Sequence, residues 1–96
     1  MLMLITYDVA TGDAAGRRRL RRVARLCKDF GQRVQYSVFE CEIDPAQWAM
    51  LRTRLKEEIN AEVDSLRFYR LGANWRSRIE HIGAKPSYDP AGPLLV

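Results

Sequence analysis

The stretch of sequence that decides the fold is Arg33-Val34-Gln35-Tyr36-Ser37-Val38-Phe39-Glu40. It lies within residues 32–43, where valine and aromatic residues alternate with polar ones, as in a half-buried strand. No glycine or asparagine marks a turn inside this segment. The pattern predicts either one long strand bent near Ser37 or two short strands that meet there.

A second strand is predicted at the start of the chain, over residues 1–7. Apolar side chains fall on both of its faces, because Leu2 and Leu4 alternate with Met3 and Ile5. A strand with two apolar faces is typical of the centre of a sheet. Asp8 follows at its carboxyl end, where the ladder stops and a carboxylate can meet solvent or a metal ion.

Between these strands the sequence predicts a long helix, with Asp13 as its N-cap and Gly31 as its stop. Its apolar residues recur at helical spacing. They are Leu20, Val23, Ala24, Cys27 and Phe30. The opposite face carries arginines, and no glutamate on the helix is placed to pair with them. We interpret this face as a surface for phosphates rather than an ordinary solvated face.

The remaining pattern predicts a second helix that opens at Asp44-Pro45, with Gln47 completing a capping box and Asn60 as its stop. Strands are expected over residues 65–71 and 79–83. The order gives an α+β fold with helices on one face of an antiparallel sheet. Residues 1–83 form the single domain, and residues 84–96 are a Pro-rich tail. Because the segment after Leu71 is apolar, we expect the last strand to serve dimerisation.

Charge is distributed unevenly along the chain. Basic residues outnumber acidic ones 16 to 12, which gives a net charge of +4. Residues 17–33 hold eight basic side chains against Asp29 alone, whereas residues 40–64 hold seven acids against three bases. One side of the molecule should therefore be electropositive, which favours a polyanionic partner such as nucleic acid.

Other features exclude several classes of protein. No apolar stretch is long enough for a membrane helix, and the first residues lack the pattern of a signal peptide, so we expect a cytoplasmic protein with no membrane partner. Cys27 and Cys41 are isolated, which predicts reduced thiols in the core rather than a zinc site or a disulfide. His81 is the only histidine and is expected at the surface.

On these residues the chain resembles the family of CRISPR-associated protein two. The resemblance rests on the strand ending in Tyr7-Asp8, on the arginine-rich helix and above all on residues 33–40, and it covers residues 1 to about 82. It implies a ferredoxin-like βαββαβ fold with an extra C-terminal strand, and a homodimer. It also implies a role in spacer acquisition for antiviral defence, with the integrase, CRISPR-associated protein one, as a partner.

The resemblance further implies a site. Asp8 would be the metal-binding acid and Tyr7 its neighbour, while Arg33 and Phe39 would be the basic and aromatic members of the catalytic set. The loop before the arginine-rich helix varies in length within the family, so the match of individual arginines stays open. The nucleic-acid-binding residues expected are Arg17, Arg18, Arg21, Arg22, Arg25 and Arg33.

The chemistry open to these residues is phosphodiester hydrolysis. Mg²⁺ keeps several waters and needs only one or two carboxylates, so one ion can be shared between the two Asp8 of a dimer. A metal-activated water could attack a phosphodiester while arginines stabilise the developing charge.

Two functions therefore stay open. The first is a Mg²⁺-dependent endonuclease, of the endoribonuclease class, that cuts single-stranded RNA or double-stranded DNA. The second is a non-catalytic, DNA-binding dimer that bridges integrase subunits. An RNA-recognition module on the same fold would need more strand aromatics than Phe39 and Tyr69.

Overall fold

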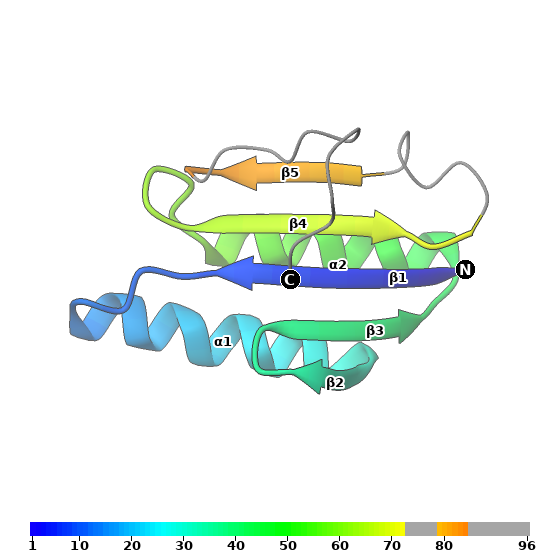
Figure 1. The fold of residues 1–96 in the computed structure, drawn as a ribbon, viewed down its shortest axis with the longest axis horizontal. Coiled ribbons are helices and arrows are strands. Elements are labelled where there is room, and N and C mark those ends of the chain that lie inside the picture. The colour runs from blue at the N-terminus through cyan, green and yellow to red at the C-terminus, as the bar shows by residue number, and fades with distance from the viewer. Residues whose placement is uncertain (73–78, 85–96) are drawn as a thin grey trace.

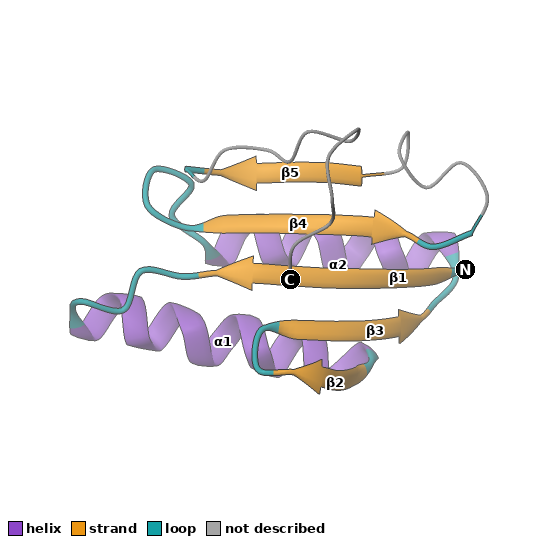
Figure 2. Cartoon of the chain, viewed as in Figure 1, coloured by secondary structure: helices purple, strands orange, loops and turns teal. Residues whose placement is uncertain are grey.

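The computed structural model describes residues 1–72 and 79–84. In chain order the elements are β1 (Leu2–Asp8), α1 (Ala14–Phe30), β2 (Gln32–Gln35), β3 (Val38–Glu42), α2 (Pro45–Glu58), β4 (Ser65–Arg70) and β5 (Ile79–Gly83). The strands form one antiparallel sheet in the order β2-β3-β1-β4-β5 (Figure 1). Figure 2 shows both helices on the same face of that sheet. The predicted α+β class and the extra C-terminal strand are confirmed.

β1 is the central strand, as its two apolar faces predicted. It pairs with β3 on one side and with β4 on the other. Met3, Ile5 and Tyr7 are buried in the core with the apolar residues of the helices. Asp8, the last residue of the strand, is exposed.

The segment left open between one bent strand and two short strands forms two strands. β2 and β3 are joined through Tyr36 and Ser37, and their register shifts between Arg33 and Gln35. The turn is held by Tyr7, whose backbone N–H donates to the Ser37 carbonyl at 3.1 Å. The Tyr7 hydroxyl donates to the Tyr36 carbonyl at 3.3 Å. Bonds from β1 thus hold this two-residue connection, which contains no glycine.

The predicted helix boundaries hold at three of the four ends. Asp13 caps α1 by accepting a hydrogen bond from the Gly16 amide at 2.7 Å, and Gly31 follows its last residue. Asp44 and Gln47 form the capping box of α2. The predicted stop at Asn60 is wrong by one residue, because α2 ends at Glu58 and Ile59 is its C-cap. Asn60 instead begins the turn into β4, and its carbonyl accepts from the Asp64 amide at 2.7 Å.

β5 lies at the edge of the sheet and pairs with β4 of the same chain. The predicted last strand is thus present, while its role in dimerisation stays a prediction. The tail proposed at residues 84–96 lies outside the described residues beyond Ala84. Within the described ranges, no helix combines the length and the apolar character that crossing a membrane requires.

His81 is not the surface residue that the sequence predicted. It is half-buried on β5, opposite Arg67 of β4. Its Nδ1 lies 3.2 Å from Nε and 3.1 Å from Nη2 of Arg67. Arginine N–H groups only donate, so Nδ1 is the acceptor and carries no proton in this arrangement. The sequence pattern does not reveal a cross-strand arginine, so an isolated histidine is expected at the surface.

Candidate functional site

Asp8 occupies the rim of the sheet that the sequence predicted for it. Side chains alternate along β1, and Tyr7 is buried on the side of the helices. The Asp8 side chain therefore projects from the opposite face of the sheet. It is exposed, and its backbone pairs in register with Ser65 of β4. A carboxylate with this access could hold a hard cation such as Mg²⁺.

A metal site is not complete within the described part of one chain. Over residues 1–72 and 79–84, no three His, Cys, Asp or Glu side chains gather closely enough to hold an ion. Mg²⁺ takes one or two carboxylates and keeps waters for its other positions. A site shared by two chains, each giving one Asp8 carboxylate, stays a prediction.

Tyr7, Arg33 and Phe39 form one cluster on the helix side of the sheet. The Tyr7 and Phe39 rings are stacked, with centroids 6.2 Å apart, and the Arg33 guanidinium carbon lies 5.1 Å from the Phe39 centroid. Burial raises the pKa of Tyr7 and nearby Cys27 acts in the same direction, whereas Arg33 partly opposes them. The cluster joins β1 to the β2–β3 hairpin.

This cluster is separated from Asp8 by the sheet itself. Phe39 is fully buried and Tyr7 is only 6% exposed, so neither offers a surface on which a nucleic acid could rest. The structure thus brings together three of the four residues predicted to be catalytic and leaves Asp8 on the other face. The catalytic role of Tyr7, Arg33 and Phe39 stays a prediction, and their contacts give them a clear structural role.

The predicted phosphate-binding face of α1 is a continuous row of cations. A groove of about 270 Å³ is lined by Arg18, Arg21, Arg22 and Arg25. All four side chains are exposed, while Val23 and Cys27 pack on the opposite side of the helix. Of these four, only Arg22 has an ion pair in the described part of the chain, with Glu58 at 3.9 Å. The row, which we call the arginine row, therefore points away from the sheet.

Two neighbouring arginines differ from this row. Arg17 donates to the Thr11 carbonyl at 3.4 Å, so it borders the loop that follows Asp8. Arg19 turns inward, and its Nε lies 2.8 Å from an Asp64 oxygen. Sequence reasoning missed the role of Asp64, because 45 residues separate the two partners. The only local signal was an acid placed directly before a strand.

Asp64 is a fully buried carboxylate. Burial alone would raise its pKa, but hydrogen bonds from Arg19 and from the Asn60 and Ala10 amides hold that pKa below the usual value. The same interaction raises the pKa of Arg19. Asp64 is therefore ionised and paired near neutral pH.

The two cysteines are buried and free, as predicted. Burial, with a smaller contribution from Cys41, raises the pKa of Cys27 to about 12. A thiol with so high a pKa is not a nucleophile near neutral pH. Neither cysteine contributes to the candidate chemistry.

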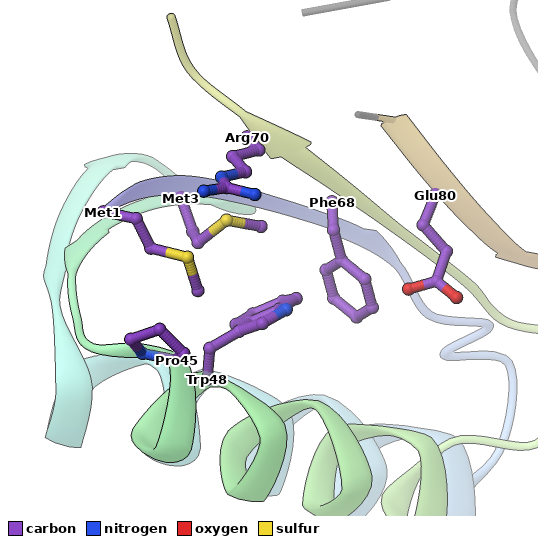
Figure 3. Close-up of a pocket in the computed structure, with 7 residues that line it drawn as sticks. All are labelled: Met1, Met3, Pro45, Trp48, Phe68, Arg70 and Glu80. Carbon is purple, nitrogen blue, oxygen red and sulfur yellow. The ribbon is translucent and has the colours of Figure 1, made fainter. Parts of the chain in front are cut away.

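A pocket that the sequence did not predict lies at the other end of β1 (Figure 3). Its volume is about 430 Å³. It is lined by Met1, Met3, Pro45, Trp48, Phe68, Arg70 and Glu80. Trp48 meets the Phe68 ring edge-on at 4.8 Å, and Arg52 pairs with Glu80 beside it. None of the predicted catalytic residues lines this pocket.

Comparisons with known proteins point in one direction. The family model described as CRISPR associated protein Cas2 matches residues 1–79. The CRISPR-associated endoribonuclease Cas2 of Nitratidesulfovibrio vulgaris is 65% identical over 96 residues, which cover all of this chain and 94% of that protein. The protein of the same name from Chlorobaculum tepidum is 58% identical over the full length of both chains.

A solved structure supports the same relation. The crystal structure of Streptococcus pyogenes Cas2 at pH 6.5 superposes with a TM-score of 0.71 and 55% sequence identity. The match covers 83% of this chain and 96% of that chain. Fold and sequence therefore agree on the relationship.

Proposed function

The chain belongs to the Cas2 family of CRISPR-associated proteins, and on this basis we propose that it is a Mg²⁺-dependent endonuclease of antiviral defence. It would hydrolyse phosphodiester bonds in single-stranded RNA or double-stranded DNA and act in spacer acquisition. The observation that carries the proposal is the exposed Asp8 at the rim of the sheet. The two relatives named above are called endoribonucleases, and these names support hydrolysis of a phosphodiester bond as the class of reaction.

The proposed division of labour follows from the chemistry of each group. Asp8 from each of two chains would hold one Mg²⁺, which when bound supplies an activated water and charge stabilisation. The arginine row would hold the sugar–phosphate backbone. Arg18 and Arg22, like Arg21 and Arg25, stand one helical turn apart, which is about 6 Å along the axis. Such a row contacts phosphates without regard to base sequence.

One geometric observation favours a second candidate function. The arginine row points away from the sheet, and Asp8 projects from the face that carries no helix. A backbone held in the groove of one chain is therefore not delivered to Asp8 of that same chain. This suits a non-catalytic homodimer that holds duplex DNA and bridges two copies of the integrase, CRISPR-associated protein one.

One experiment decides between the two candidates. Purified protein is incubated with labelled single-stranded RNA and with duplex DNA, in Mg²⁺ or in EDTA, beside an Asp8→Ala variant. The nuclease proposal expects cleavage that needs both Mg²⁺ and Asp8. Binding without cleavage would favour the bridging dimer. Equal cleavage by wild type and Asp8→Ala would show that the activity belongs to a contaminant.

The proposed sharing of one ion has its own test. Wild type and Asp8→Ala are co-assembled in equal amounts, so that about a quarter of symmetric dimers carry two intact carboxylates. If both carboxylates are needed, the cleavage rate falls to about one quarter; if each chain acts alone, it falls to about one half. A rate near one half would contradict the shared ion.

A further inference from the structure

Four segments of the chain meet at Asp64, three of them at its buried carboxylate and one at its backbone carbonyl. Its Oδ1 accepts from the Ala10 amide at 2.9 Å, in the loop after β1. Its Oδ2 accepts from the backbone N–H of Asn60 at 2.9 Å and from Arg19 Nε at 2.8 Å. Its backbone carbonyl accepts from the Ala84 amide at 3.1 Å, at the end of β5. We call this arrangement the Asp64 junction.

The junction lies at the same end of the sheet as Asp8. Asp64 directly precedes Ser65, which is the register partner of Asp8. Gly83 lies on the other side of the junction. Its φ is +125°, a backbone conformation that other residues rarely adopt, and a Cβ at this position would collide with the Asp64 carbonyl oxygen. The rim on which Asp8 stands is therefore built around this one residue.

The loop that leaves Asp8 is held from two sides. Ala10 lies two residues after Asp8, and its N–H is bound by Asp64. The Ala10 carbonyl oxygen packs against Gly16 so closely that a Cβ at Gly16 would collide with it. Val9, which lies between Asp8 and Ala10, is buried in the core. The direction in which the chain leaves Asp8 thus depends on the Asp64 side chain and on the first turn of α1.

We propose that Asp64, with its partner Arg19, is a positioning residue that fixes the Asp8 carboxylate relative to α1 and its arginine row. This inference rests on the proposed function, since Asp8 is the group whose placement it explains. A buried ion pair is weak evidence for stability as such, because desolvation offsets much of its attraction. Its contribution is geometric, since an apolar side chain could not accept hydrogen bonds from three segments at once.

The test compares Asp64→Asn with wild type by amide hydrogen exchange and by RNA cleavage. The amide keeps the shape of the side chain but replaces one of its two acceptors with a donor, and both positions face N–H donors, Ala10 and Arg19 on one side and Asn60 and Arg19 on the other. We expect exchange at the Ala10 amide to accelerate roughly 10- to 100-fold while core amides such as that of Ile5 stay protected. The cleavage rate at saturating RNA should fall about tenfold or more, while the Kd for RNA changes less than about twofold.

Glu80→Gln is the matched control. Glu80 also accepts hydrogen bonds from an arginine of another element, but that arginine, Arg52, lies on α2 and not in the loop after Asp8. This variant should leave Ala10 exchange and the cleavage rate unchanged. If Asp64→Asn fails to fold, Arg19→Gln replaces it; this variant leaves the bonds to Ala10 and Asn60 in place, so we expect a smaller acceleration of Ala10 exchange and a smaller loss of cleavage. Slower Ala10 exchange and faster cleavage in Arg19→Lys than in Arg19→Gln would support the proposal, because lysine keeps the positive charge.

A further readout keeps this proposal separate from the proposed function. Mn²⁺ broadens the NMR signals of groups near its site, and Asp64→Asn should need about tenfold more Mn²⁺ to broaden the Asp8 amide. A wild-type protein that cuts neither RNA nor duplex DNA would defeat the proposed function, and exchange and Mn²⁺ broadening would still decide the positioning role. Uniform acceleration of all amides, or unchanged Ala10 exchange with unchanged Mn²⁺ dependence, would overturn it.

Discussion

The arginine row and the rim at Asp8 are built in opposite ways. The row repeats one residue type along an exposed face of one helix, and a single exposed ion pair, from Arg22 to Glu58, joins it to another element within the described part of the chain. Asp8 is a single carboxylate whose position depends on a buried junction made of several segments. We therefore expect the arginine row to keep part of its function when one arginine is replaced, whereas replacement of Asp8 should abolish the function of its site.

The same contrast appears within α1 itself. Arg19 is 20% exposed and lies 2.8 Å from a fully buried Asp64 oxygen. Arg22, less than one turn away, is 60% exposed and stands 3.9 Å from Glu58. Exposed pairs at that distance contribute about 0–1 kcal/mol. Identical side chains on one helix therefore serve different tasks, according to the burial of the partner.

The largest effect is expected at Asp8. Asp8→Asn keeps the shape of the side chain but removes the charge that holds the ion, so the rate of RNA cleavage should fall about 10³-fold or more. Binding of RNA should be unchanged, because the arginine row is intact. Single-turnover cleavage and a parallel titration measure the two quantities. If Asp8→Asn lost RNA binding as well as cleavage, Asp8 and the arginine row would not have separate functions.

A smaller effect is expected for the buried cluster behind the sheet. Phe39→Leu removes the ring contacts with Tyr7 and Arg33 but keeps an apolar side chain in the core. Urea unfolding should show a loss of about 1–1.5 kcal/mol in the free energy of unfolding. Cleavage per folded molecule should stay close to that of wild type. A selective loss of cleavage without loss of stability would make Phe39 part of the chemistry.

The arginine row should show itself in the salt dependence of binding. Replacing Arg18 and Arg25 with glutamine removes two phosphate contacts, so the slope of log K against log salt should flatten by roughly one to two units. Arg54→Gln with Lys56→Gln removes the same charge from an exposed part of α2 and is the control. Equal flattening by both pairs would mean that net charge, rather than the row, holds the backbone.

The smallest effect concerns the response of the Asp64 junction to acid. The pKa of Asp64 in the folded chain lies below its ordinary value of 3.8. Its contribution to stability is therefore complete above that value and is lost as pH falls through the folded pKa. The gap in unfolding free energy between wild type and Asp64→Asn should narrow below pH 3.8, as followed by urea unfolding. A gap that stays constant into acid would show that Asp64 is not held as an anion.

The sequence predicted the local elements well because local signals specify them. The Asp13 cap and the Asp44–Gln47 capping box lie within one helical turn of the groups that they bind. The two apolar faces of β1 predict its position at the centre of the sheet. The sequence does not decide whether Tyr36 and Ser37 form a turn, since the turn is held by Tyr7, which lies 29 residues before Tyr36.

The candidate site could be predicted only in part for the same reason. Asp8 and the arginine row were found from residue type and spacing. The sequence did not indicate that Tyr7 and Asp8, neighbours in the chain, would face opposite sides of the sheet with separate surroundings. It also gave no sign of the Asp64–Arg19 and Arg67–His81 contacts, which join distant strands and helices.

The most direct test of this account is a double-mutant cycle on RNA cleavage and binding. Wild type, Asp8→Asn, Arg18→Gln/Arg25→Gln and the combined variant are compared on one labelled RNA in Mg²⁺. We predict that Asp8→Asn lowers only the saturating cleavage rate, that the arginine variant weakens only binding, and that the two effects add within about 0.5 kcal/mol. An arginine variant that lowers the saturating rate as much as Asp8→Asn, or Asp8→Asn with wild-type cleavage, would contradict the account.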